Sequence, residues 1–168
     1  MTLINSLADE ECQKEDNLGS AKGVFEFEGR MAMYNKILVP IDLSSPERAE
    51  AILKKAEELL DATGHIVLLN VVEDLPIYLT IDLPMNILEN AVEDARKKLN
   101  SLKLKSSRIS DVDVRSGSPA REILAAAEDL KTDLIIIASH KPDLSNYFIG
   151  ATADRVVRHA RCPVLIDR

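Results

Sequence analysis

The chain has few cysteines and no long hydrophobic run, and each absence excludes a class of protein. Its two cysteines among 168 residues, Cys12 and Cys162, lie far apart and form no C-x-x-C pair. A disulfide framework is therefore excluded, and two reduced thiols are expected. No segment approaches the ~18 consecutive apolar residues that span a bilayer. Acidic residues stand at 9–11, where a signal peptide needs an apolar core, so we expect a cytoplasmic protein without a membrane partner.

Positive charge is also scarce. The chain has 21 Lys and Arg residues against 28 Asp and Glu residues, which gives a formal net charge of -7. Such a chain gains little from releasing counterions on a phosphate backbone, so nucleic acid is not an expected partner. An anionic phospholipid surface is disfavoured for the same electrostatic reason.

The motifs of familiar nucleotide-binding loops and nucleophile turns are absent. Neither G-x-x-x-x-G-K-[ST], G-x-G-x-x-G nor G-x-S-x-G occurs, and after residue 33 the only glycines are Gly64, Gly117 and Gly150. No Ser or Cys nucleophile with an acidic partner accompanies His140, so we expect that side chain to form a local hydrogen bond. No two His or Cys residues share a helix face. The residues therefore indicate neither a catalytic centre nor a metal site.

The first 33 residues differ in composition from the rest. They hold seven acidic and three basic side chains, so this segment carries -4 of the net charge. The one regular pattern in it is a short alternation of Phe and Glu at 25–28. We expect residues 1–33 to form a flexible N-terminal extension and residues 34–168 to form the domain. Met31 and Met33 precede the domain, and either could be the natural start.

From Tyr34 onward, apolar runs alternate with amphipathic segments of helical period. Short continuous apolar runs are typical of strands buried in a parallel sheet, and a Val/Asp alternation indicates a half-exposed edge strand. The predicted strands are 36–42, 66–72, 111–115, 134–138 and 163–166. The predicted helices are 46–64, 84–102, 119–130 and 150–160.

Particular residues mark the ends and inward faces of these helices. Ser45 can cap the first helix, and we expect Gly64 to end it in the left-handed conformation. Helical spacing places Leu88 on the inward face of the second helix, and Val156 and Val157 on that of the last. Five strands alternating with four helices predict an α/β fold, with an open five-stranded parallel sheet and helices on both faces.

Ligands of such sheets bind beyond the carboxyl ends of the strands, where the strand order reverses. Asp42 and residues 138–140 stand at two of these ends. A helix beginning near Gly150 directs unpaired N–H groups at an anion, and Lys141 adds a positive charge. Plainer roles stay open: a turn cap for Asp42, a helix start for Gly150 and a solvated side chain for Lys141. The apolar connection at 75–83 would cover either a base or a partner.

The two ends of the predicted domain resemble a known family. The run KILVPID at 36–42 is similar to the first strand of universal stress proteins. The run ASH at 138–140, followed by GATADRVVRHARCPVL at 150–165, is similar to their C-terminal signature. The resemblance covers residues 34–168 in register. It implies the adenine nucleotide alpha hydrolase-like fold, with strand order 3-2-1-4-5.

The resemblance also implies a nucleotide site, although the family's motif is altered. Nucleotide-binding members carry G-x-x-G, nine residues and then G-[ST]. Here Ala138 and Lys141 replace the first two glycines, the spacer 142–149 has eight residues, and Gly150 is followed by Ala151. Thr152 is the nearest hydroxyl. The residues that the resemblance assigns to ATP or another adenine nucleotide, with or without Mg²⁺, are Pro40, Ile41, Asp42, Val71, Ala138, Ser139, His140, Lys141, Gly150, Ala151 and Thr152.

Two functions follow from the resemblance. The first is a stress-response module that binds an adenine nucleotide as a regulatory ligand, with slow ATP hydrolysis at most and no catalytic residue, because no water-activating base, arginine finger or P-loop lysine is evident. The alternative is a nucleotide-free module that acts through an unidentified protein partner. Both imply a homodimer through the last strand, from Cys162 to Asp167, whose edge would otherwise stay open.

Overall fold

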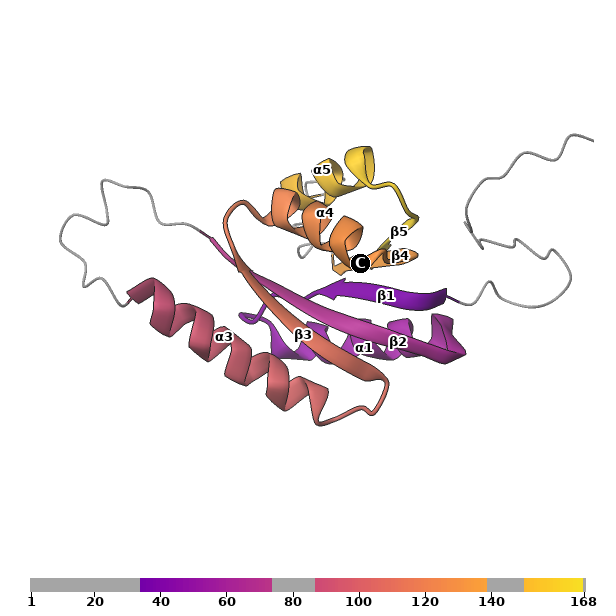
Figure 1. The fold of residues 1–168 in the computed structure, drawn as a ribbon, viewed down its shortest axis with the longest axis horizontal. Helices are drawn as coiled ribbons and strands as arrows, with labels where there is room; N and C mark the ends of the chain where they lie inside the picture. The colour runs from indigo at the N-terminus through magenta and orange to yellow at the C-terminus, as the bar shows by residue number, and fades with distance from the viewer. Residues whose placement is uncertain (1–33, 74–86, 139–149, 168) are drawn as a thin grey trace, which may run out of the picture.

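The predicted alternation of strands and helices is present in the computed structural model, which describes residues 34–73, 87–138 and 150–167 (Figure 1). The strands are β1 (Tyr34–Pro40), β2 (Leu60–Val72), β3 (Ile109–Ser116), β4 (Leu134–Ala138) and β5 (Val164–Asp167). The helices are α1 (Pro46–Leu59), α3 (Ile87–Lys103), α4 (Pro119–Leu130) and α5 (Ala151–His159). None of these described helices is long and apolar enough to cross a membrane. The connection at 75–83 and the predicted helix start at Pro84 lie outside the described residues.

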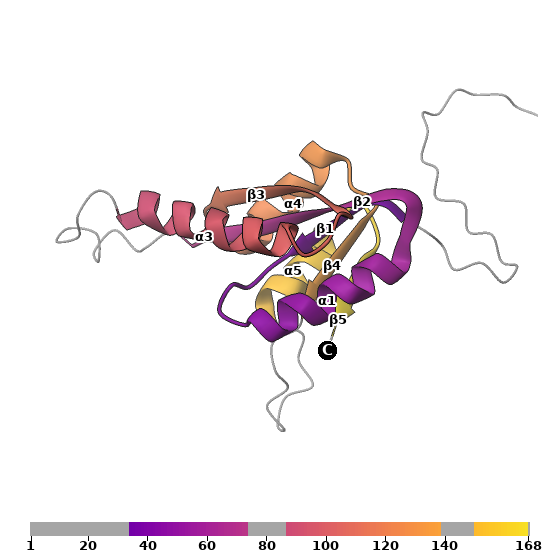
Figure 2. The ribbon, with the colours of Figure 1, turned by 90° about the horizontal axis from the view of Figure 1, so that it is seen from below.

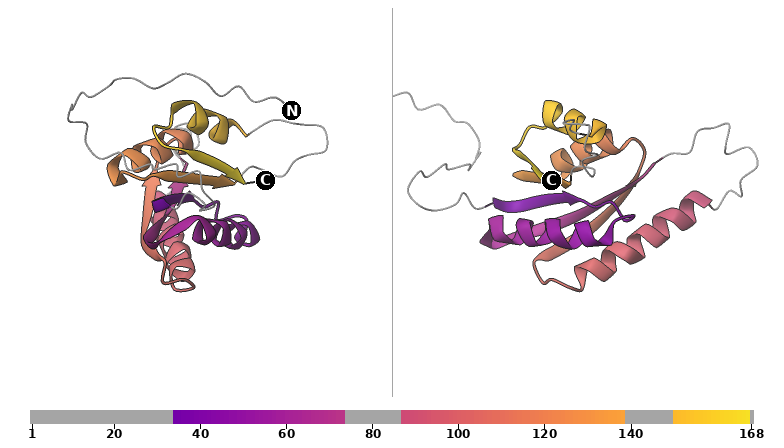
Figure 3. Two further views of the ribbon diagram at one scale, coloured as in Figure 1. Left: turned by 90° about the vertical axis from the view of Figure 1, so that its right-hand side faces the viewer. Right: turned by 180° about the vertical axis from the view of Figure 1, so that it is seen from behind.

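The five strands form one parallel sheet with the order β3-β2-β1-β4-β5. The chain starts at the centre, moves outward to β3 and then returns to the other side of β1. The order therefore reverses between β1 and β4. Helices α1 and α3 cover one face of the sheet, and α4 and α5 cover the other (Figures 1 and 3). The predicted fold class and strand order are confirmed.

A buried apolar cluster lies on each face of the sheet. Successive side chains of β1 point to opposite faces: Ile37 and Val39 join the cluster under α1 and α3, and Leu38 joins the cluster under α4 and α5. All three side chains are fully buried. A central strand covered on both sides needs apolar residues at every position, which explains the continuous apolar run in the sequence.

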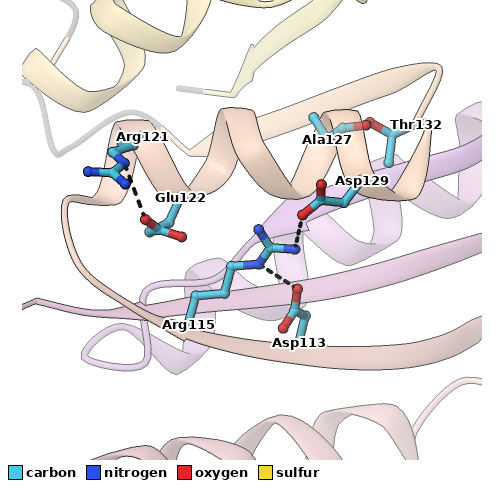
Figure 4. A network of polar contacts seen from close by, with 7 residues as sticks. All are labelled: Asp113, Arg115, Arg121, Glu122, Ala127, Asp129 and Thr132. Atoms are coloured by element: carbon cyan, nitrogen blue, oxygen red, sulfur yellow. Dashed lines mark hydrogen bonds and ion pairs between the residues drawn. The ribbon is translucent and has the colours of Figure 1, made fainter.

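Arg115 of the edge strand β3 forms one ion pair within its own strand and one with α4 (Figure 4). The Arg115 guanidinium donates from Nε to Asp113 Oδ2 at 2.8 Å and from a terminal nitrogen to Asp129 Oδ2 at 2.9 Å. Val112 and Val114, which alternate with these charges, pack against the cluster under α1 and α3. The half-exposed edge strand predicted from this alternation is confirmed.

The first helix ends earlier than the sequence predicted. α1 ends at Leu59, and Leu60 is extended, with φ -82° and ψ 135°. Leu60 is buried in the core and pairs with Tyr34, so the chain passes directly from the helix into β2. Gly64 lies inside β2, and the prediction that it ends the helix in the left-handed conformation is wrong. Burial of Leu60 outweighs the local signal of the glycine.

Gly64 instead allows β2 to approach the start of β1 closely. A β-carbon at this position would lie 2.8 Å from the Tyr34 carbonyl oxygen and 3.0 Å from that of Asn35. Both are backbone atoms of a paired strand and cannot rotate away. We expect Gly64→Ala to lower the free energy of unfolding by about 1–3 kcal/mol, the usual cost of overpacking. Denaturant unfolding measures this, and an unchanged midpoint would contradict the close approach.

Two side chains predicted to face inward are exposed. Val157 is 45% exposed, whereas its neighbour Val156 is fully buried, so α5 buries a narrower stripe than the sequence predicted. Leu88 is 42% exposed in the first turn of α3, which extends beyond the end of β3 (Figure 2). Helical spacing marks the apolar face of a helix but does not fix how much of that face the sheet covers.

Candidate functional site

A cavity of about 610 Å³ lies at the carboxyl end of the sheet, on the side where the strand order reverses. Its walls come from the end of β1 and the residues that follow it, the ends of β2 and β4, the first two turns of α1 and α4, and the first turn of α5. This is the place where open parallel sheets bind their ligands. The fold therefore positions the site, and the residues at these ends determine its chemistry.

Asp42 shapes the turn that leads from β1 into α1. Its Oδ1 accepts hydrogen bonds from the Ser44 backbone N–H at 2.9 Å and from the Ser44 hydroxyl at 2.7 Å. Ser45 is the N-cap residue of α1, as predicted, although its side chain makes no capping hydrogen bond. Asp42 thus has the turn role considered as the plainer alternative, and the same residue lines the cavity.

Hydrogen bonds hold the residues after β1 against the end of β2. The Ile41 backbone N–H donates to the Leu69 carbonyl at 2.7 Å, and the Asn70 side-chain amide donates to the Ile41 carbonyl at 2.8 Å. Both backbone groups of Ile41 are therefore paired. Pro40 precedes this residue and Val71 follows Asn70, so both belong to a wall whose backbone is fixed on two strands.

The first turn of α5 forms the opposite wall. Gly150 is the N-cap residue, with φ -56° and ψ 149°, and its carbonyl accepts from the Asp154 N–H at 2.9 Å. This conformation is open to any residue, so the backbone itself does not require glycine here. Among the described residues, a β-carbon at Gly150 would meet no atom within 4 Å. These residues therefore leave space beside the helix N-terminus, and such termini favour anions.

Residues from distant parts of the predicted site meet at this cavity. Eight of the eleven candidates line it: Pro40, Ile41, Asp42, Val71, Ala138, Gly150, Ala151 and Thr152. Ser139, His140 and Lys141 lie outside the described residues. Asp42 and Gly150 thus line one cavity, and the spacer 142–149 lies outside the described residues.

Sequence reasoning missed three polar residues of the cavity wall, which are Arg48, Asn70 and Glu73. Asn70 could have been found, because it interrupts the apolar run of β2 close to the carboxyl end. Arg48 and Glu73 carry no comparable signal, since charged residues are common in α1 and after strands. Together with Asp42 they give the described wall one positive and two negative charges.

The wall also has an apolar part, formed by Ile52, Ile123 and Ile137. An apolar surface suits a planar base, whereas the helix N-terminus suits an anionic group. Among the residues that the structure describes, no group of three or more His, Cys, Asp or Glu side chains could hold a metal ion. The described part of the cavity is therefore suited to binding a small molecule with an apolar end and an anionic end.

Comparison with known proteins gives a consistent result. The sequence profile described as the Universal stress protein family matches residues 33–168. Universal stress protein G of Shigella flexneri is 31% identical over 143 residues, which cover 81% of this chain and 100% of that protein. A structure of a universal stress family protein from Burkholderia pseudomallei has a TM-score of 0.59 at 26% identity and covers 81% of this chain and 97% of the other.

The fold is also shared with a universal stress protein solved in complex with cAMP. That structure has a TM-score of 0.50 at 22% sequence identity, and the match covers 81% of this chain and 98% of the other. The neighbours have the adenine nucleotide alpha hydrolase-like fold, and the sheet described above has the same order. On the match of the family profile over residues 33–168, this chain belongs to the universal stress protein family.

Proposed function

We propose that this protein binds an adenine nucleotide, ATP or a related one, as a regulatory ligand in a stress response. The observation that carries the proposal is the cavity between Asp42 and Gly150, which unites the ends of β1, β2 and β4 with the N-terminus of α5. That a universal stress protein of the same fold binds cAMP supports the same class of ligand.

The two ends of the cavity would hold different parts of the nucleotide. Asp42 and the backbone of Val71 would contact the adenosine, and the apolar side chains of the wall would pack on the base. The phosphates would lie on the amides of 139–141 and of 150–152, with Lys141 and a bound Mg²⁺ as possible cations. Amides at a helix N-terminus donate to phosphate oxygens, and the helix dipole adds to the attraction.

The direct test is binding of nucleotide to the full chain after bound ligand has been stripped. We expect ATP, AMP or cAMP, with Mg²⁺ present, to give a heat of binding by calorimetry. Ligand at about 100 times its Kd stabilises the folded state by about 2.7 kcal/mol, which corresponds to a melting shift of about 5–10 °C for a chain of this size. No heat and no shift at millimolar nucleotide would refute the proposal.

A nucleotide-free interaction module is the second candidate function. The observation that favours it is the altered motif: Ala138 and Lys141 stand where nucleotide-binding members have glycine, and the spacer is one residue short. The same calorimetry separates the two candidates. If none of the three nucleotides binds, the protein acts through the surface it presents to a partner.

Both candidates include a homodimer formed through β5. This strand is at the edge of the sheet, and Leu165 on it is 37% exposed. An open strand edge with apolar side chains favours pairing with another copy. A native mass spectrum of the full chain should give twice the chain mass of 18.6 kDa. A mass of one chain at micromolar concentration would contradict the dimer.

A further inference from the structure

A second cavity, of about 240 Å³, lies at the amino end of the sheet, where α4 and α5 end. Its apolar lining comes from Leu124, Ala127 and Ala160. Cys162 also lines it and is half-buried. This cavity is at the opposite end of the strands from the nucleotide site, so the proposed nucleotide function does not account for it.

The rim of this second cavity carries more positive than negative charge. The cations Lys131 and Arg161 line it, against the carboxylate of Glu128, which pairs with Arg161 at 3.3 Å. Among the lining residues, Lys131 is therefore the excess positive charge. An occupant of complementary chemistry has an apolar side chain flanked by acidic groups.

The start of the domain lies beside this cavity. The Asp133 carboxylate accepts from the backbone N–H groups of Asn35 and Lys36, at 2.8 and 3.0 Å, and Thr132 next to it lines the cavity. The Lys36 ammonium donates to the Leu130 carbonyl at 3.0 Å. Figure 1 shows that β1 begins at the end of the sheet where α5 turns into β5. Residues 1–33 therefore leave the domain close to the cavity.

Those first residues include a segment of matching chemistry. Residues 25–28 read Phe-Glu-Phe-Glu, so in an extended conformation both rings lie on one side and both carboxylates on the other. Phe27 is seven residues before Tyr34, and an extended chain of that length spans about 25 Å, which is ample for a neighbouring cavity. A cavity of about 150 Å³ already holds a benzene ring, so the second cavity has room for one phenyl group.

We propose that residues 25–28 dock on the cavity between the ends of α4 and α5, with a phenylalanine ring inside it and the glutamates against Lys131 and Arg161. The acidic N-terminal segment is then an internal ligand of its own domain. A docked ring covers Cys162, so the reactivity of this thiol reports on docking.

The test uses the full chain with Cys12→Ser, so that Cys162 is the one thiol that reacts with Ellman's reagent. We expect the double substitution Phe25→Ser and Phe27→Ser to raise the reaction rate about tenfold, because burial of one aromatic ring is worth about that factor or more. The matched control, Leu7→Ser with Leu18→Ser, removes apolar side chains from the same extension and should leave the rate unchanged. Equal rates for the parent and the phenylalanine variant would overturn the proposal.

A charge exchange provides an independent second arm. Glu26→Lys alone should raise the rate, because it removes a favourable charge from the docked segment. In an Arg161→Glu background, where the charge beside the thiol is held constant, adding Glu26→Lys should instead lower the rate. A rim that is merely destabilised would not reverse the sign of the effect. Circular dichroism checks that each variant is folded. If the reaction rate of Cys162 instead falls as the protein concentration rises, and is the same with and without Phe25 and Phe27, a second copy covers the cavity and the proposal is wrong.

Discussion

Gly150→Ala should weaken the binding of adenine nucleotide about 10–100-fold, the equivalent of losing one hydrogen bond to a charged group. The reason is steric. Phosphate oxygens reach the amides of a helix N-terminus only if no side chain stands between them, and a methyl group at the N-cap of α5 occupies that approach. Calorimetric titration of the stripped protein with ATP gives the change in Kd.

The same substitution should change the free energy of unfolding by less than about 1 kcal/mol, because the poorer N-cap preference of alanine is offset by its smaller loss of backbone entropy on folding. A β-carbon at Gly150 meets no atom of the described residues within 4 Å, and the φ of -56° is accessible to alanine. Gly64→Ala is the opposite case, because its new methyl group meets backbone oxygens at the other end of the sheet. It should lower the melting temperature and leave the Kd unchanged at temperatures where the protein is folded. If Gly150→Ala binds nucleotide as tightly as the parent, phosphate does not lie on α5.

The strands were predictable because burial on both faces of the sheet requires continuous apolar runs, which are easily recognised in the sequence. The runs that contain Ile37 and Ile136 have apolar residues at every position, and only a sheet covered on both sides needs that pattern. The strand order came from the resemblance to the family, since alternation alone leaves several orders open. The end of α1 was not predictable, because Leu60 is apolar and fits both a helix face and a strand. The pairing of Leu60 with Tyr34 places Leu60 in a strand and not in the helix. This pairing forms only when β1 and β2 lie side by side in the folded sheet.

Part of the candidate site was likewise predictable from the sequence, and part was not. Asp42 and Gly150 stand at strand and helix ends, and parallel topology brings such ends together whatever lies between them. Arg48 reaches the cavity from the first turn of α1, and its position depends on how that helix lies on the sheet. The sequence shows which residues share a face of a helix, but it does not show which face is turned toward a ligand. For this reason the mixed charge of the cavity wall was visible only in the structure.

Leu99→Ala should cause the largest loss of stability, about 2–5 kcal/mol, as expected for a leucine removed from a packed core. Leu99 is fully buried in the cluster under α1 and α3. Among the residues of α3 whose side chains the structure describes, Ala95 and Leu99 are the two that are buried. Leu99 is the larger of the two, and of the α3 side chains that contact the core it is more deeply buried than Leu102, which packs partly buried against the same cluster.

Leu104, just after the end of α3, provides a matched control because it is 89% exposed. Leu104→Ala makes the same chemical change outside the core and should alter the free energy of unfolding by less than about 0.5 kcal/mol. Urea unfolding of the two variants measures the difference, and similar m-values would show that the transition stays comparable. Equal midpoints for the two variants would mean that α3 is not packed on the sheet as described. A large difference would show that one side chain secures the helix that covers the β2 and β3 edge.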